Sequence, residues 1–262
     1  MRTLLRTLAI TLGIAASASA QAGNTTPYYL FSGDDQKAVE ISGGVVVNSF
    51  NIPSLGYPAA VSSTIWLGNR DNNGAAEFGL NGVATGKTSA GAGGISQLLD
   101  GTTNGAAHNY GVTCCGLNAV TVANPDWSGQ TPLFDLPDNG SGIAFDTAAG
   151  TLFVSLYSGL INQYALSGTL LSSFSTEGFI AGLAYEQNTD TLWGWDRDSQ
   201  SLRQFSTDGA LLQTNPVDVR SYGVNNPFGG EMATVTNVPE PASFAVLGAG
   251  LVALGWLRRR RA

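Results

Sequence analysis

Few residues in this 262-residue chain could carry out nucleophilic or acid–base chemistry. It has a single histidine, His108, and its two cysteines, Cys114 and Cys115, are adjacent. A serine hydrolase needs a base and an orienting acid beside its nucleophile, and no Gly-x-Ser-x-Gly stretch stands in a strand-to-helix setting. A lone histidine is more often a structural hydrogen-bonding residue than a catalyst. We therefore expect no catalytic residues of this type.

Metal binding is also poorly supported. One histidine and two adjacent cysteines do not provide the three or four ligands that zinc takes. Calcium stays open because it accepts carboxylates and carbonyls. Acidic clusters occur at Asp34 and Asp35, at Asp196 and Asp198, and at Asp71 before Asn72-Asn73-Gly74. None matches an Asp-x-Asp-x-Asp-Gly loop, and Asp and Asn often bond their own backbone in turns. We interpret these clusters as turns and predict no bound cofactor, with Ca²⁺ as the alternative.

The adjacent cysteines have two possible states. Their Cα atoms lie about 3.8 Å apart across a trans peptide, which is below the usual range for a disulfide. Free thiols seldom persist in an oxidising compartment. The pair can therefore form a strained ring or stay reduced and buried. We favour a disulfide between Cys114 and Cys115 that stiffens the loop between His108 and Ala119.

The elements around these residues repeat with a period of about forty. Residues 142–146, 151–154, 161–164 and 168–171 are matched by residues 182–186, 191–195, 202–205 and 209–212. Each unit reads as four short apolar runs separated by turn residues, which predicts four antiparallel strands. Four strands per unit of this length is the signature of a β-propeller blade. Large aromatic residues would fill the spaces between blades: Trp66, Phe145, Phe153, Tyr185, Trp193 and Trp195.

Three weaker copies bring the count to five blades. One uses residues 28–31, 38–41 and 45–50; a second uses 59–61, 65–67, 76–80 and 82–83; the most divergent uses 95–99, 108–112, 119–122 and 132–136. The first copy lacks an inner strand, and residues 229–235 read as the missing one. We therefore predict an all-β, five-bladed propeller over residues 23–236 whose C-terminal strand completes the first blade. A β-sandwich or jelly roll is the alternative, but neither explains a forty-residue period.

Charge limits the partners of this region. Without the six arginines and the one glutamate of the two chain ends, 6 basic and 18 acidic residues remain, a net charge of −12. Such a surface repels the phosphates of nucleic acids and anionic lipid headgroups, which argues against both as partners of this region. High Gly content and only 12 % charged residues favour many short turns over long helices.

The N-terminus reads as a secretory signal peptide over residues 1–22. Arg2 and Arg6 precede a short apolar run, and small residues follow that suit cleavage after Ala20 or Ala22. Charge, apolar core and cleavage site come in the order that export requires.

The C-terminus carries a second signal over residues 237–262. Val238, Pro239, Glu240 and Pro241 precede an apolar stretch over residues 244–257, which ends at Arg258, Arg259, Arg260 and Arg261. The stretch predicts a marginal transmembrane helix, because it is shorter than the about 20 residues that span a bilayer comfortably. The arginine block stops transfer and stays in the cytoplasm, so the preceding chain lies on the far side.

This tail closely resembles the PEP-CTERM sorting signal. The resemblance covers residues 238–262 and rests on Pro239-Glu240-Pro241, the apolar segment and the arginine cluster. It implies export across the inner membrane of a Gram-negative bacterium and cleavage by an exosortase near the Pro-Glu-Pro. It further implies transient anchoring in the inner membrane and then release to the cell surface or an exopolysaccharide matrix.

The repeats resemble secreted β-propellers of the NHL and SMP-30 groups over residues 28–235. The SMP-30 resemblance implies a possible lactonase-like hydrolase with one divalent metal at the central channel. Carboxylates at inner-strand ends are the candidates for its ligands: Asp146, Glu186, Glu231 and Asp100. They match no metal motif residue by residue and equally suit turns. We therefore expect a non-enzymatic binding or structural protein associated with polysaccharide or another matrix component, with the hydrolase as the alternative.

Overall fold

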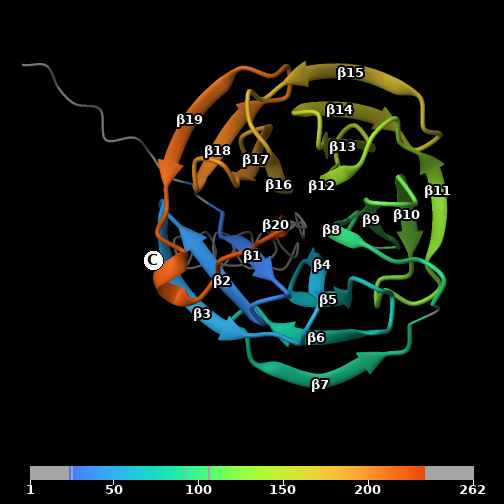
Figure 1. Cartoon of the computed structure of the whole chain (residues 1–262), viewed down its shortest axis with the longest axis vertical. Coiled ribbons are helices and arrows are strands. Elements are labelled where there is room, and N and C mark those ends of the chain that lie inside the picture. The colour runs from blue at the N-terminus through green and yellow to red at the C-terminus, as the bar shows by residue number, and fades with distance from the viewer. Residues whose placement is uncertain (1–23, 25, 92, 106, 234–262) are drawn as a thin grey trace, which may run out of the picture.

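The computed structural model describes residues 24, 26–91, 93–105 and 107–233. The predicted signal peptide and sorting tail lie outside this range. Within it, no helix is long and apolar enough to cross a bilayer. Figure 1 shows five sheets arranged as a ring around one axis.

Each sheet is a four-stranded antiparallel blade that extends outward from the axis. From its innermost strand outward, blade 1 contains β20 (Gly229–Met232), β1 (Tyr28–Ser32), β2 (Lys37–Ser42) and β3 (Val45–Asn51). In the same direction, blade 2 contains β4 (Gly56–Val61), β5 (Thr64–Asn69), β6 (Ala75–Gly79) and β7 (Ala84–Ser89). Blade 3 contains β8 (Leu98–Thr103), β9 (Asn109–Thr113), β10 (Ala119–Ala123) and β11 (Thr131–Asp135). Blade 4 contains β12 (Gly140–Asp146), β13 (Thr151–Leu156), β14 (Leu160–Ala165) and β15 (Leu170–Ser175). Blade 5 contains β16 (Ile180–Glu186), β17 (Thr191–Asp196), β18 (Ser201–Ser206) and β19 (Leu211–Pro216).

The ring closes through the first blade, which confirms the sequence prediction. β20 pairs antiparallel with β1, with Tyr28 opposite Met232 and Tyr29 opposite Glu231. Asp35 adds a second connection, because one of its oxygens accepts the backbone N–H groups of Asn225 (2.6 Å) and Asn226 (2.9 Å). The last strand is therefore part of the fold and ties the two ends of the ring together.

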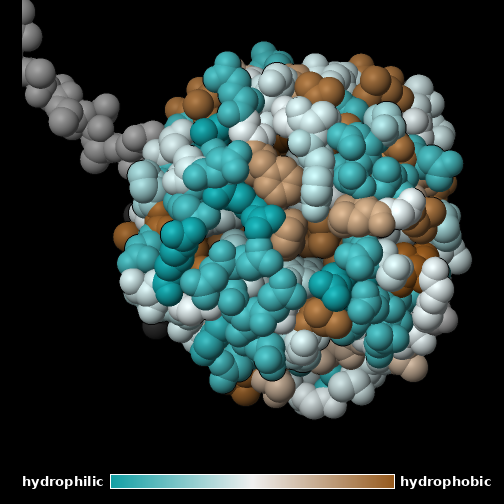
Figure 2. Space-filling view, viewed as in Figure 1, coloured by the Kyte–Doolittle hydropathy of each residue, from teal (hydrophilic) through white to brown (hydrophobic). Residues whose placement is uncertain are grey.

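The alternating strand directions give the ring two faces. The lower face carries the turns between the first and second and between the third and fourth strands of each blade. The chain enters β1 and leaves β20 on this face. The upper face carries the turns between the second and third strands, the connections between blades and the short 3₁₀ helix η1 (Arg220–Tyr222). Figures 1 and 2 look onto the upper face.

Apolar side chains from neighbouring blades form the core. Phe153, Trp193 and Trp195 are fully buried, and Phe145 and Tyr185 nearly so, as the repeat predicts. Trp66 is only partly covered. A residue that the prediction omitted, Trp127, lies between blades 2 and 3 and donates its indole N–H to the Trp66 carbonyl (3.0 Å).

A glycine in the last turn of a blade packs on an aromatic ring of the preceding blade. Gly82 contacts Phe50, Gly168 contacts Phe134, and Gly209 contacts Phe174. All three glycines have positive φ, between 78° and 98°. A Cβ would overlap the ring and would also disfavour the backbone conformation. These contacts lock neighbouring blades together at their outer edges.

The divergent copies contain the errors of the sequence interpretation. In blade 2 the predicted fourth element, Gly82-Val83, is a turn, and the strand follows at residues 84–89. That strand is fully polar apart from Ala84 and Gly86, so it lacks the apolar alternation that marks a half-buried strand. In blade 3 the inner strand begins at Leu98 rather than at Ile95, because Gln97 adopts a left-handed φ of 62°.

Candidate functional site

Asp100 fills the axis of the ring. It lies in the middle of β8, not at a strand end as predicted, and is fully buried. One carboxylate oxygen accepts the backbone N–H groups of Ile143 (2.8 Å) and Leu183 (2.9 Å), and the other accepts that of Gly230 (2.8 Å). These donors belong to the inner strands of blades 4, 5 and 1. A single carboxylate therefore joins four of the five blades.

Glu231 is the second buried acid at the axis. One of its oxygens accepts the Met232 N–H (2.9 Å), whereas Oε2 has no hydrogen-bond partner. Burial, and after it the charge of Asp100, raises the pKa of Glu231, although a hydrogen bond from Thr102 opposes this. Burial likewise raises the pKa of Asp100, against the effect of the backbone amides. Three backbone N–H groups donate to Asp100 and one donates to Glu231, so fewer backbone donors oppose the effect of burial on Glu231.

The structure does not bring Asp146, Glu186 and Glu231 together. Asp146 accepts the N–H groups of Ala148 and Ala149 in its own turn. Glu186 accepts the Trp193 indole N–H (2.8 Å) and the Thr26 N–H (3.1 Å). Across the described residues, no three His, Cys, Asp or Glu side chains gather as a metal site would need.

The acidic turn clusters lie in equivalent turns of the upper face, and they bond partly within their own turns and partly to distant chain, as Asp35 does to Asn225 and Asn226. Asp196 accepts the backbone N–H of Asp198 (2.9 Å) and pairs with Arg203 (2.7 Å). Ser32 donates its hydroxyl to Asp35 (2.6 Å). The oxygens of Asp196 and Asp35 are therefore largely used within the fold.

His108 and the cysteines lie on opposite faces. His108 is exposed on the lower face, where its ring meets that of Tyr110 edge-on. The structure joins Cys114 and Cys115 by a disulfide in the upper-face turn between β9 and β10. The Cys115 N–H donates to the Asn139 side-chain oxygen (2.6 Å), and the Asn139 carbonyl accepts the Tyr157 N–H (2.9 Å). The disulfide turn is thus connected to Tyr157.

An aromatic cluster occupies the upper face near the axis. We define it by four rings and one cation: Tyr57, Tyr157, Phe179, Phe228 and Arg197. Phe179 contacts Tyr157 edge-on, with ring centroids 4.7 Å apart, and Phe228 contacts Tyr57 in the same way at 5.8 Å. Tyr157 is 38 % exposed, and Figure 2 shows apolar surface near the centre of this face. Tyr57 is buried beneath the cluster, and Phe179 and Phe228 are partly exposed. Because the rings pack edge-on against one another, they hold Tyr157 and Phe179 in place for a ligand.

Arg197 lies over two of these rings. Its guanidinium carbon is 4.0 Å from the centroid of Phe228 and 5.5 Å from that of Phe179, within cation–π distance. It donates to the Asn226 side-chain oxygen and makes no ion pair among the described residues. Partial burial lowers its pKa. Arg197 therefore orients the cluster and keeps donor capacity for a ligand.

A cavity of about 310 Å³ opens beside the cluster, between blades 4 and 5. Tyr157 and Phe179 form its aromatic side, and Glu177 and Asp198 supply carboxylates. Its remaining lining residues are small: Ser158, Gly159, Ser175 and Gly178. Aromatic rings beside hydrogen-bond acceptors suit a ligand with both apolar C–H faces and hydroxyl or amino groups.

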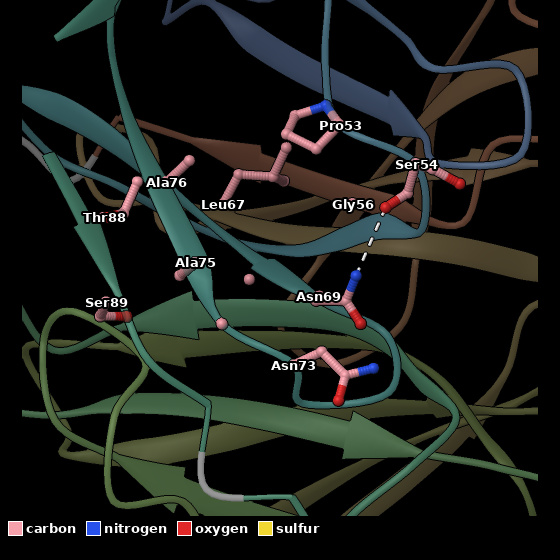
Figure 3. A pocket seen from close by; sticks show the side chains of 12 residues that line it. Pro53, Ser54, Gly56, Leu67, Asn69, Asn73, Ala75, Ala76, Thr88 and Ser89 are labelled. Carbon is pink, nitrogen blue, oxygen red and sulfur yellow. Dashed lines mark hydrogen bonds between the residues drawn. The ribbon is translucent and has the colours of Figure 1, made fainter. Parts of the chain in front are cut away.

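A second cavity, of about 280 Å³, lies at the upper end of blade 2 (Figure 3). Its lining combines the apolar side chains of Pro53, Leu67 and Ala75 with the amides of Asn69 and Asn73. The Asn69 amide donates to the Ser54 carbonyl (3.3 Å) across one edge. No lining residue is titratable, so this cavity offers no acid–base group.

The aromatic cluster has no direct signal in the sequence. Tyr57 lies in β4, Tyr157 and Arg197 follow β13 and β17, and Phe179 and Phe228 precede β16 and β20. Tyr157 and Arg197 occupy equivalent positions in the two clear sequence repeats, and Phe179 and Phe228 occupy equivalent positions before two inner strands. The five residues come together because inner-strand entrances converge at the axis, which only the closed ring shows.

Comparison with known proteins yields one match in sequence. Residues 237–261 match the PEP-CTERM protein-sorting motif, as predicted from the tail. The chain is thus an exported surface protein with a membrane-anchoring C-terminal sorting signal that exosortase processes. No curated protein matches the chain.

Solved structures similar to the propeller support the fold alone. One chain of a nidogen/laminin complex matches with a TM-score of 0.55 and 12 % identity over 79 % of this chain and 98 % of that chain. A protein of unknown function from Bacteroides caccae matches at TM-score 0.48, 15 % identity and 72 % of each chain. Virginiamycin B lyase from Staphylococcus aureus matches with a TM-score of 0.42 and 16 % identity, over 71 % of this chain and 69 % of that chain. Together with the sheet order, the first of these matches places the chain among the β-propellers.

Proposed function

We propose that this exported propeller is a non-catalytic polysaccharide-binding protein of the Gram-negative cell surface or extracellular matrix. The observation that carries the proposal is the upper-face aromatic cluster with its adjoining cavity. The rings of Tyr157 and Phe179 can stack on the C–H faces of a sugar ring. Glu177, Asp198 and the Arg197 guanidinium can accept from or donate to its hydroxyl groups.

Charge refines the class of polysaccharide. The region between the two chain-end signals carries a net charge of −12, and Glu177 and Asp198 flank the cavity itself. A polyanionic polymer would be repelled by this field. We therefore expect a neutral or amino-substituted polysaccharide, and binding of the amino-substituted form should weaken as salt rises.

The test is native affinity electrophoresis of the processed protein in gels that contain the host's own polysaccharide. Tyr157→Ala should lower the affinity measured from the retardation about ten-fold, equivalent to about 1.4 kcal/mol of binding free energy. Tyr222→Ala is the matched control, because Tyr222 is also exposed (43 %) on the upper face but lies outside the cluster. Wild-type protein that is not retarded, or equal loss in both variants, would contradict the proposal.

The lactonase-like hydrolase remains the competing hypothesis. It needs a divalent metal, and Asp146, Glu186, Glu231 and Asp100 each have other hydrogen-bond partners within the fold. Metal analysis of purified protein separates the two hypotheses: a stoichiometric divalent ion would favour the hydrolase, and its absence would favour the binding protein.

A further inference from the structure

The lower face carries most of the exposed aliphatic side chains. Eight exposed large hydrophobic residues belong to the third-to-fourth-strand turns or to the first residues of the outer strands: Val45, Val47, Val83, Leu166, Leu170, Leu171, Leu211 and Leu212. They come from blades 1, 2, 4 and 5, and Val83 is the most exposed at 63 %. We call this set the lower rim. The other exposed large hydrophobics of the described chain, Leu117, Tyr157 and Tyr222, lie on the upper face.

The lower face is also poor in charge. Among the described residues that lie between the strands at this face, only Asp126, Asp190 and Asp208 carry a formal charge. Asp146 and Glu186 end strands here but are buried. The acidic charge that would repel anionic headgroups is therefore sparse on this face. The upper face has both signs in its turns, including Arg70 beside Asp34 and Asp71. A ring of aliphatic side chains with few charges costs little to move from water to a lipid interface.

The chain leaves the propeller on this same face. β20 ends at Met232, the sorting motif begins at residue 237, and the apolar stretch begins at Phe244. Ten residues, 234–243, separate the described chain from that stretch and span at most about 35 Å. An anchored protein therefore keeps its lower face close to the bilayer, at an effective concentration in the millimolar range.

We propose that the lower rim docks on the lipid bilayer while the sorting tail is in the membrane, so that the upper face points away from it. Aliphatic contacts without a positive patch bind membranes weakly by themselves, and stable attachment takes two signals. Here the tail is the first signal and the rim the second. Cleavage near Pro239 removes the tether, after which the rim alone does not hold the protein.

The experiment uses the full chain reconstituted in vesicles of phosphatidylethanolamine and phosphatidylglycerol. An environment-sensitive NBD fluorophore is attached to Val83→Cys on the lower rim or to Tyr222→Cys on the upper face, without reductant so that Cys114 and Cys115 stay paired. We expect brighter, blue-shifted emission from position 83 only. Replacing Leu170, Leu171, Leu211 and Leu212 by Ser should return that emission to the aqueous value, and their exposure means that the fold should persist.

Three outcomes would overturn the proposal. Equal emission of the aqueous type from positions 83 and 222 would show that the lower rim does not contact the bilayer. A signal at position 83 that persists in processed protein without vesicles and grows with protein concentration would identify a second copy of the chain as the occupant. Retention of processed protein on vesicles would show that the rim binds without the tether. None of these results bears on polysaccharide binding at the upper face.

Discussion

The axis and the upper face both place charged side chains near the centre of the ring, but the two regions satisfy them differently. At the axis Asp100 is fully buried, and its two oxygens accept three backbone N–H groups. On the upper face Arg197 has one amide oxygen and two aromatic rings as partners. Backbone N–H groups therefore satisfy most of the hydrogen-bonding capacity of Asp100, whereas Arg197 keeps N–H donors for a ligand.

This difference separates structural from functional residues. A buried charge is tolerated only when it is hydrogen-bonded, and losing one partner is costly. A half-exposed guanidinium or tyrosine on a rigid face is stable in water, and its unused groups bind a ligand without rearrangement. We therefore expect substitutions at the axis to change stability, and substitutions in the aromatic cluster to change binding.

Removing β20 should have the largest effect on the structural side. A chain that ends at Asn226 loses the ladder between β20 and β1 and the Gly230 amide that binds Asp100. The truncated chain also lacks Glu231, the second buried acid at the axis. We expect loss of the cooperative melting transition, measured by circular dichroism. Full retention of the transition would show that the ring does not depend on its closure.

Asp100→Asn should have the next largest effect. An amide supplies only one acceptor oxygen, so at least the Gly230 N–H loses its partner and faces a second donor. A buried donor without a partner costs about 1–3 kcal/mol. Urea unfolding measures the change, and Asp208→Asn is the control because that carboxyl is exposed. Equal midpoints for the two variants would contradict the structural role of Asp100.

Glu231→Gln should change how the free energy of unfolding depends on pH more than it changes the free energy of unfolding at low pH. The folded pKa of Glu231 is raised by burial, so its contribution is fully present below the unfolded pKa of about 4.3 and is lost as pH rises through the folded pKa. Glutamine mimics the protonated form and keeps the acceptor for Met232. Above about pH 4.5 the variant should become more stable relative to wild type, by at most about 1.4 kcal/mol in the free energy of unfolding per pH unit. A constant difference between pH 5 and 8 would show that Glu231 is ionised in the fold.

The repeat predicted the blades and the ring closure, because a four-stranded sheet with two apolar faces can bury both only by stacking. It also predicted the acidic turn of Asp196, which bonds locally, but not the contacts of Asp35 with Asn225 and Asn226. It could not predict the partners of Asp100, which are backbone N–H groups 43 to 130 residues away and leave no side-chain pattern. Phe228 was equally hidden, because it ends the long connection between β19 and β20, which has no counterpart in the other blades.

Tyr157→Ala gives the smallest expected effect on stability and makes the comparison sharpest. The side chain is 38 % exposed and contacts the cluster mainly through the ring of Phe179. Surface substitutions of this kind usually change stability by no more than about 0.5 kcal/mol. The same variant is expected to lose about ten-fold in polysaccharide binding, or about 1.4 kcal/mol. Unfolding and affinity electrophoresis on one preparation should therefore show a binding loss well above the stability loss. If stability falls by as much as binding, the cluster holds blades 4 and 5 together as Asp100 holds the axis, and the distinction between the two regions fails.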